Sequence, residues 1–525
     1  MSLENSNRLI SEFENGKGIE LQARLEKYSK DRRNWLEEIW LRKAYLEQRD
    51  SLVINCSYFM LFNDARMNHS NIQLYRAANL IFNANRYKDL EKETEFAGKT
   101  ALCMFQYSTI FGTTRIPQKG CDAMFQNRES KHILVLFKDQ IFQLGLQNEM
   151  TKGDIFTSLK TILDTKVDQP RIAALTSLNR DKWADLYVKI KKNNPENIDI
   201  IENALFAVSL DEMNQDVNHN GKQILHGTNR WYDKCLSFVV GNNGRMGLNG
   251  EHTPCDAVIP GKLVEYCVDE ECPFDESSER SLTVKKLRWN VEPDIEKAIE
   301  EAESELMLRG NNLGLFIHHQ NIGSNSIKKL KISPDAFIQI CLQTTYYKIR
   351  NSFANTYETA STRKFFHGRT ECARPLSVEA KEFVQSFLSN DSFSIQYAKL
   401  VKFSNSHIEQ LRMCADGHGV DRHLLGLKSM LKTNEECEFF ADPNFAEFFT
   451  FRLSTSNMSP ADHYIGLGFG PATKDGYGIN YCISKEKIRV TISAAPGKPE
   501  EFKSVFENVV KKILAMGESV VGNKL

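Results

Sequence analysis

The sequence lacks the marks of a disulfide framework, a structural zinc site or a membrane span. None of its 12 cysteines stands in a Cys-x-x-Cys pair, and Cys267 and Cys272 have no second pair at zinc-ligand spacing. Residues 1–16 contain no apolar core of the kind that directs secretion. No run of about eighteen apolar residues occurs. We therefore expect reduced cysteines, no signal peptide and no transmembrane segment.

An excess of charge of either sign is also missing. The 67 basic and 68 acidic residues leave a net charge of −1, so no overall field attracts nucleic acid or an anionic membrane. The composition, 41% hydrophobic and 26% charged, is that of an ordinary globular protein. The 525 residues exceed a single core, which predicts two domains of roughly 200 to 300 residues or three smaller ones.

Three common catalytic signatures are absent: GxxxxGK[ST], GxSxG and HExxH. "GFGPATKDGYG" (468–478) has spaced glycines, but it lies between expected strands and not in a dinucleotide-binding βα turn. No repeat, low-complexity tract or flexible linker interrupts the chain, so composition does not mark the domain boundary. These absences exclude the enzyme classes that carry these three signatures.

Local patterns predict a mixed α/β protein. Residues 18–49 carry apolar residues at helical spacing, and Ser333 before Pro334 predicts a capped helix. "HILVLFKDQIFQLGL" (132–146) predicts two strands around a turn, and four further strands are expected in 448–495. Because helices and strands alternate irregularly, we expect mixed α/β layers.

The turn "GLNGEHTPCDA" (247–257) places His252 after small residues and Asp256 four positions later. A neutral imidazole is a natural base at pH 7, and a nearby carboxylate can fix its tautomer. Glycines allow close approach to a substrate. Taken alone, the segment is more typical of a surface loop with a capping aspartate, so a catalytic role needs support from elsewhere in the chain.

Other polar clusters, each taken alone, also fit an ordinary surface role as well as a ligand-binding one. "SIKKLKISPD" places Lys328 and Lys331 before a helix N-terminus, which suits a phosphate but is also common in solvated loops. In "RLSTS", Ser454 and Ser456 share one face of a strand, as an oxyanion site or a polar edge strand would have them. Arg422 opens an apolar helix, and if buried it needs an anion from the protein or from a ligand.

Taken together, these residues resemble the carnitine/choline acyltransferase family. Matching segments run in the family's order over nearly the whole chain, among them "RNWLEEIWLRKAYL", "GNNGRMGLNGEH", "SPDAFIQICLQTTYY" and "DRHLLGLK". "YETASTRKFFHGRTE" is most similar to the peroxisomal octanoyl branch, and the "GFGP…DGYG" region to the acetyl branch. The resemblance implies an α/β fold with two chloramphenicol-acetyltransferase-like domains and a tunnel at their interface. We place the catalytic-histidine domain at 1–290 and the coenzyme A and carnitine domain at 291–525.

The family's roles carry over to matching positions. His252 is the implied general base, Asp256 its partner carboxylate and Ser456 the oxyanion donor. The implied carnitine-binding residues are Tyr357, Thr370, Arg422, Ser454 and Phe469, where Phe469 faces the trimethylammonium. Choline has no carboxylate and the choline branch lacks this arginine, so Arg422 favours carnitine.

Lys328 and Asp335 match positions that contact coenzyme A, and Lys331 is expected to help with its phosphates. For the acyl pocket, Leu467 would cap the space and favour short chains. A strand slip of one residue would place Gly468 or Gly466 there and open it. We expect a short- or medium-chain acyl-CoA.

The resemblance thus implies reversible acyl transfer between coenzyme A and carnitine, with the coenzyme A thioester as substrate and neither a cofactor nor a metal. The alternatives are a non-catalytic acyl-CoA or carnitine-binding homologue and a choline acyltransferase. The tail Asn523, Lys524, Leu525 is a near variant of a peroxisomal address. It predicts a peroxisomal import receptor as partner and the peroxisome as location, with cytoplasm or mitochondrion as alternatives.

Overall fold

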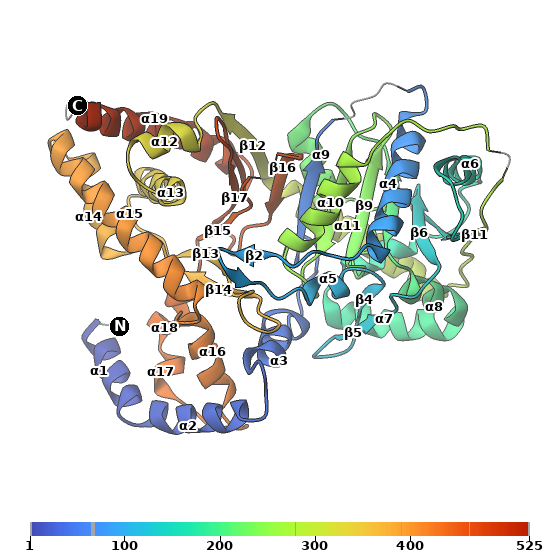
Figure 1. Ribbon diagram of the computed structural model, residues 1–525. Helices are drawn as coiled ribbons and strands as arrows, with labels where there is room; N and C mark the ends of the chain where they lie inside the picture. The colour runs from blue at the N-terminus through green and yellow to red at the C-terminus, as the bar shows by residue number, and fades with distance from the viewer. Residues whose placement is uncertain (1–2, 65–68, 279, 390, 461, 523–525) are drawn as a thin grey trace.

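The computed structural model of the chain describes residues 3–64, 69–278, 280–389, 391–460 and 462–522. Within these ranges the strands form an eight-stranded sheet, a six-stranded sheet and two small two-stranded ribbons. Helices cover both large sheets, and the two sheets stand side by side in the molecule (Figure 1). The predicted mixed α/β class with two sheet-containing domains is confirmed.

The eight-stranded sheet forms most of the N-terminal half. Its β6–β7 hairpin has the predicted turn, where Lys138 and Asp139 both have positive φ (49° and 60°), as a two-residue hairpin loop requires. In spatial order its strands are β11 (Val284–Lys286), β7 (Gln140–Gly145), β6 (His132–Phe137), β8 (Ala207–Asp211), β9 (Leu236–Gly241), β10 (Met246–Glu251), β1 (Ser57–Phe62) and β16 (Tyr464–Phe469).

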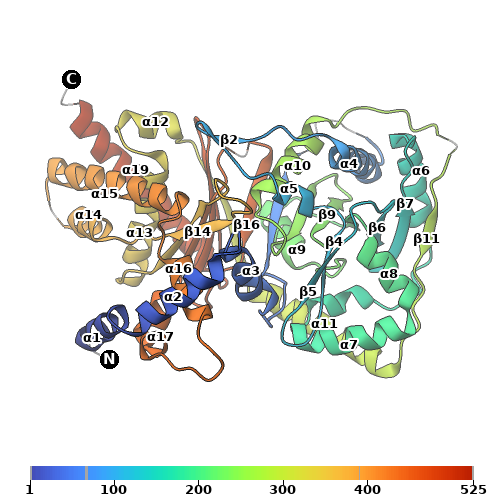
Figure 2. The same cartoon turned by 60° about the horizontal axis from the view of Figure 1, so that its bottom comes forward.

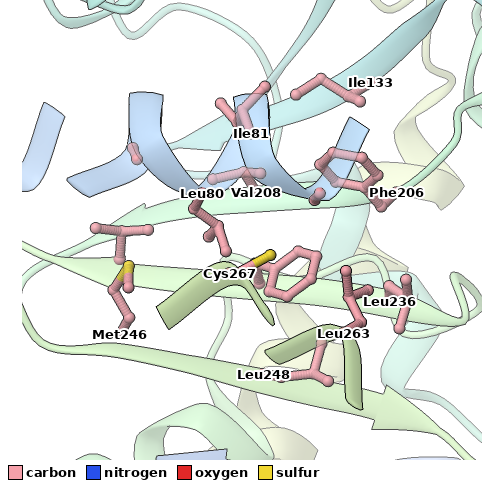
Figure 3. Close-up of a cluster of buried hydrophobic side chains, with 14 of the residues drawn as sticks. Leu80, Ile81, Ile133, Phe206, Val208, Leu236, Met246, Leu248, Leu263 and Cys267 are labelled. Atoms are coloured by element: carbon pink, nitrogen blue, oxygen red, sulfur yellow. The ribbon is translucent and has the colours of Figure 1, made fainter. Parts of the chain in front are cut away.

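Both faces of this sheet are buried. On one face, alternate strand residues such as Val208 and Leu248 pack against Leu80 and Leu263, which come from covering helices (Figure 3). The helices of this face are α4 (Ile72–Asp89), α6 (Lys152–Leu163) and α10 (Val258–Asp269). The other face carries η2 (Ile172–Ser177), α7 (Arg180–Asn193), α8 (Pro195–Asn203), α9 (Val217–His226) and α11 (Pro293–Asn311).

The six-stranded sheet forms the C-terminal half. Its strands in spatial order are β12 (Gly314–Gln320), β18 (Ile488–Ala494), β17 (Tyr477–Ile483), β15 (Leu453–Asn457), β13 (Thr356–Ser361) and β14 (Thr370–Ala373). A core cluster joins it to α13 (Pro334–Arg350), α14 (Val378–Leu388), α15 (Phe393–Ala415) and α19 (Lys498–Gly522), and α12 (Ser324–Lys329) lies before α13. The predicted cap of α13 is confirmed, because the Ser333 hydroxyl accepts from the Ala336 N–H.

Two segments cross between the halves. Strand β16 pairs with β1 and so belongs to the N-terminal sheet. Helices α1 (Leu3–Glu14) and α2 (Lys17–Ser29) lie beside α16 (Asp421–Ser429), α17 (Glu438–Ala441) and α18 (Pro443–Phe448) (Figure 2). Leu25 and Leu427 share their apolar cluster, and Glu435 forms ion pairs with Lys17 and Arg24. The boundary at residues 290–291 stays a prediction.

None of the described helices combines the length and the apolar character needed to cross a membrane.

Candidate functional site

His252 follows the last residue of β10 and is fixed there by contacts from both sides. Its backbone N–H donates to the Cys56 carbonyl at 3.1 Å. Its Nδ1 lies 3.3 Å from the Tyr45 hydroxyl, and the two rings stack at 5.6 Å. The Tyr58 ring packs edge-on at 5.4 Å. The imidazole is therefore held between two tyrosines.

The electrostatic setting keeps His252 neutral. Burial lowers the pKa of His252, and the Arg369 guanidinium acts in the same direction, while Asp256 and the carbonyls of His252 and Cys255 oppose them. The net shift of its pKa is downward from the ordinary 6.5. A neutral imidazole at physiological pH has a lone pair with which to accept a proton.

Asp256 is buried near His252, but its described partners are other side chains. Arg369 Nε forms an ion pair with its Oδ1 at 3.1 Å, and Gln106 Nε2 donates to its Oδ2 at 3.0 Å. Burial alone would raise the pKa of Asp256, but Arg369 and His252 outweigh it and lower the pKa. Asp256 is thus an anion, and its direct neighbour is Arg369.

Tyr45 belongs to a π-helical segment, η1 (Leu41–Leu46), which follows α3 (Leu36–Trp40). The Glu47 N–H donates to the Arg42 carbonyl at 2.8 Å, five residues back. A π-helical turn changes the direction of the side chains that follow, and such turns are frequent at functional sites. In this protein the π-helical turn contains Tyr45, whose hydroxyl contacts the imidazole.

A buried ion network supports this arrangement. Arg115, which is fully buried, donates to the Thr253 hydroxyl at 3.1 Å and to the Tyr45 carbonyl at 2.8 Å. Asp122 Oδ2 accepts from Arg115 Nε and from Arg180 Nε, both at 2.7 Å. One carboxylate therefore anchors two buried guanidinium groups, one of which touches both the histidine turn and η1.

Replacing Asp122 with asparagine is expected to destabilise the protein by about 3 kcal/mol, since Arg115 and Arg180 lose the carboxylate they share and keep, among the described ion pairs, only those with Glu251 and Asp233. The urea midpoint of unfolding measures the effect. Asp185→Asn is the matched control: Asp185 pairs with Lys119 on the surface, with exposed fractions of 58% and 68%, and such pairs contribute little. A midpoint for Asp122→Asn equal to that of the control would contradict the structural role.

The predicted carnitine residues Tyr357, Thr370 and Arg422 come together in the structure. Arg422 Nε donates to the Thr370 carbonyl at 2.9 Å, and its NH2 donates to the Tyr357 hydroxyl at 3.1 Å. The guanidinium also lies 3.7 Å from the ring centre of Trp40. Arg422 is only 8% exposed, yet none of the described ion pairs includes it. Glu371 acts on Arg422 electrostatically but forms no described ion pair with the guanidinium, which is therefore suited to an anionic ligand.

A cavity of about 860 Å³ opens beside this cluster. Segments distant in sequence line it: α2 and α3, the region around Gln106, the turn after His252, and the loops before β14 and α16. His252 itself does not line it, although its neighbours Thr253 and Pro254 do. The predicted tunnel between the two substrates stays a prediction. The residues that line the cavity include Trp40, Thr253, Phe366, Arg369, Thr370 and Arg422.

Ser454 and Ser456 lie on the partly exposed face of β15, while Thr455 is buried on the other. Ser454 is level with Tyr357 on the neighbouring strand β13. Phe469 lies directly opposite Tyr58 on β1, so both side chains are on the face of the sheet that packs against His252. The structure places these predicted residues around one site, and their individual roles stay predictions.

The register of β16 places Leu467 and Gly468, the predicted acyl-pocket residues, on opposite faces of the strand. Leu467 lies opposite Met60, on the same face as Phe469 by strand alternation. Gly468 faces the other side, where an added Cβ would meet Phe59 Cε1 at 2.7 Å and Thr491 Cγ2 at 2.8 Å. In this register Leu467, and not Gly468, shares the face of β16 that carries Phe469, and its place in an acyl pocket stays a prediction.

The predicted coenzyme A residues fall into two groups. Lys328 and Lys331 are exposed on α12 and the turn after it. Asp335, in the first turn of α13, accepts from the Tyr481 hydroxyl at 2.7 Å and from Asn457 Nδ2 at 2.8 Å. Asp335 is thus bonded toward the protein interior, and the lysines are free to meet a phosphate.

The sequence did not single out Trp40, Tyr45 or Gln106 as site residues. Each reaches the site only through contacts with residues far along the chain, so no local pattern marks it. No role is predicted for Arg369, next to Thr370 in "FHGRTE", although its guanidinium donates to the carbonyls of His252 (2.9 Å) and Thr253 (2.7 Å). The only local hint was its position beside a predicted ligand residue.

Comparison with known proteins adds three findings. A family model described as choline/carnitine O-acyltransferase matches residues 2–512. Carnitine O-acetyltransferase of Columba livia is 34% identical over 534 residues, covering 94% of this chain and 84% of the relative. Choline O-acetyltransferase of Sus scrofa is 30% identical over 542 residues, covering 95% of this chain and 84% of the relative.

Among solved structures, trichothecene 15-O-acetyltransferase TRI3 of Fusarium sporotrichioides has a TM-score of 0.43 at 9% identity, covering 91% of this chain and 94% of that chain. Since this likeness is weak, no inference rests on it.

Proposed function

The chain belongs to the choline/carnitine O-acyltransferase family, and from this premise we propose that it is a carnitine O-acyltransferase. It would move a short- or medium-chain acyl group reversibly between coenzyme A and carnitine, with His252 as general base. The observation that carries the choice of carnitine is Arg422: it is buried, its donors face the Tyr357 and Thr370 oxygens, and none of the described ion pairs neutralises it.

The substrate carboxylate would supply the missing anion. Trp40 lies over the Arg422 guanidinium, and its indole N–H, also buried, has no hydrogen-bond partner among the described residues. Choline carries no carboxylate, so it would not form the charge-assisted hydrogen bonds that Arg422 can donate, which contribute about 1.5–3 kcal/mol each. This argument favours carnitine over choline.

The chemistry needs only the chain's own groups. His252 takes the proton from the carnitine hydroxyl, and the oxygen attacks the thioester carbonyl. Ser456 donates to the oxygen that becomes negative, a contribution typically about 3 kcal/mol per donor. The carbon–sulfur bond then breaks, and His252 returns the proton to the coenzyme A sulfur. Holding both substrates together contributes up to about 7–11 kcal/mol.

The test is release of free thiol from acetyl-, hexanoyl- and octanoyl-CoA, measured with carnitine, with choline and with neither. We expect carnitine-dependent release with acylcarnitine as product. Thiol release without carnitine, or equal rates with choline, would contradict the proposal. Acyl-CoA binding without transfer would instead identify a non-catalytic homologue.

We extend the proposal to the remaining contacts. Lys328 and Lys331 would meet the phosphates of coenzyme A, with Asp335 nearby, and Phe469 would face the trimethylammonium of carnitine. We propose no cofactor or metal besides the coenzyme A substrate. The tail Asn523–Lys524–Leu525 lies outside the described residues, so recognition by a peroxisomal import receptor remains a proposal from sequence alone.

Replacing Leu467 with glycine is expected to raise the ratio of kcat/KM for octanoyl-CoA to that for acetyl-CoA at least tenfold. Leu467 is buried on the face of β16 that carries Phe469, so removing its side chain opens space beside the reaction centre. Leu467→Met, which conserves volume, is the control and should keep the wild-type profile. An unchanged ratio in the glycine variant would remove Leu467 from the acyl pocket.

A further inference from the structure

We infer that Thr455 and Glu358 are positioning residues for the carnitine site. From the helix-covered face of the six-stranded sheet, they hold the two strands whose other face carries predicted carnitine residues. This inference rests on the proposed function, and it assigns a role to buried polar side chains that lie behind the site and not in it.

Strands β13 and β15 carry different side chains on their two faces. On β13, Tyr357 is partly exposed and Glu358 is buried. On β15, Ser454 is partly exposed and Thr455 is buried. The parallel pairing of the two strands places Tyr357 level with Ser454, and Glu358 level with Thr455. Glu358 and Thr455 therefore lie side by side, directly behind the pair of predicted carnitine residues.

Thr455 ties its strand both to β13 and to α13. Its Oγ1 donates to the Tyr357 carbonyl at 2.8 Å and accepts from Gln339 Nε2 at 2.9 Å. Gln339 is fully buried on α13. Tyr357 is also the residue whose hydroxyl accepts from Arg422 NH2 at 3.1 Å. One threonine hydroxyl thus fixes the backbone from which a predicted carnitine contact projects.

Glu358 is joined to the same buried layer through Tyr481. The Tyr481 hydroxyl lies 3.0 Å from Glu358 Oε1 and 2.7 Å from Asp335 Oδ1. The same hydroxyl accepts from Gln339 Nε2 at 3.1 Å. His407 Nε2 lies 3.0 Å from Asp335 Oδ2 and 3.4 Å from Glu358 Oε2. Side chains of α13, α15 and β17 therefore surround the Glu358 carboxyl.

The Glu358 carboxyl is neutral in this setting. Burial raises the pKa of Glu358 well above its ordinary 4.5, and the charge of Asp335 and a hydrogen bond to it act in the same direction. Burial would also raise the pKa of Asp335, but bonds from His407, Tyr481 and Glu358 lower it, so Asp335 keeps the negative charge. Glutamine, which is neutral and has nearly the same shape, should therefore replace Glu358 better than an apolar side chain does.

The first experiment compares Thr455→Val with Thr344→Val. Each removes one buried threonine hydroxyl from the same half of the protein, but the Thr344 hydroxyl donates to the Ile340 carbonyl within α13. We expect Thr455→Val to raise the KM for carnitine about three- to tenfold, since the lost hydrogen bond frees the Tyr357 backbone. The KM for acyl-CoA should stay within about twofold, and Thr344→Val should keep both constants.

The second experiment compares Glu358→Gln with Glu358→Met. Both side chains fill the buried space, but only glutamine can hydrogen-bond to Tyr481. We expect the methionine variant to raise the carnitine KM about tenfold and the glutamine variant at most about twofold. A residue that only filled the core would give no such rescue. Equilibrium dialysis with radiolabelled carnitine measures the Kd without turnover, and the urea midpoint of each variant measures the accompanying loss of stability.

Two results would overturn the inference: a carnitine KM and Kd for Thr455→Val equal to those for Thr344→Val, or equal carnitine constants for Glu358→Gln and Glu358→Met. If Glu358→Met does not fold, the two threonine variants decide. A wild type that neither binds carnitine nor transfers an acyl group to it would instead refute the proposed function. Because the two overturning results require an active wild type, the failures are distinguishable.

Discussion

Replacing His252 with alanine is expected to lower kcat for carnitine-dependent acyl transfer by about 10²- to 10⁴-fold, the range that a positioned general base contributes. Without the imidazole, the carnitine hydroxyl must lose its proton to water, since Tyr45 and Tyr58 stay protonated: burial raises the pKa of each phenol. Both substrates should still bind, because the proposed carnitine contacts are those of Arg422, Tyr357 and Thr370, which this substitution leaves in place.

Steady-state rates with saturating acyl-CoA and carnitine measure the loss, and equilibrium binding of each substrate tests the second part. His219→Ala is the control, since this histidine is exposed on α9. The wild-type pH profile checks the same role. Because the pKa of His252 is lowered, kcat/KM should stay on its plateau as pH falls to 6.5 and decline only at lower pH, as the base becomes protonated. Wild-type turnover in His252→Ala would refute the assignment.

Replacing Arg422 with asparagine is expected to raise the KM for carnitine about 10- to 100-fold, because a hydrogen bond to a charged group contributes about 1.5–3 kcal/mol. The KM for choline, which has no carboxylate, should change little. The ratio of the choline KM to the carnitine KM should therefore fall. The kcat at saturating carnitine should fall less than the KM rises, because in the proposed complex Arg422 binds the carboxylate and not the hydroxyl that loses its proton.

The measurement is a pair of carnitine and choline titrations at saturating acyl-CoA. Arg412→Asn serves as control, since Arg412 is 67% exposed and pairs with Glu409 on the surface. The carnitine KM of Arg422→Lys should lie between those of the wild type and Arg422→Asn, because lysine keeps the charge but lacks the planar set of donors. An unchanged carnitine KM in Arg422→Asn would remove this residue from the site and, with it, the main argument for carnitine.

Several elements of the fold could be predicted from short stretches of sequence. Ser333 capped its helix, the turn at Lys138–Asp139 closed its hairpin, and "RLSTS" alternated as a strand. Each depends on a few neighbouring residues, whose backbone preferences and hydrogen bonds act over one or two turns. Likewise, His252 and Arg422 were found because each begins or follows a local element, and their segments resemble a family over nearly the whole chain.

Other features depended on tertiary contacts. Asp256 lies four residues from His252, yet its described ion pair is with Arg369, more than a hundred positions away. Tyr45 reaches the imidazole from a π-helical segment that no periodicity predicts. Leu467 shares the face of β16 that carries Phe469 only because β16 pairs with β1 in one register, which the sequence left open.

By itself, then, the sequence determined the class of the elements, the family and the identity of most chemical groups, because backbone preferences and family motifs are written in adjacent residues. The tertiary structure decided which of those groups touch, since side-chain contacts depend on how strands align and helices pack. A shift of one residue in β16, or of one hydrogen bond in η1, would leave the local patterns intact and place different side chains beside His252.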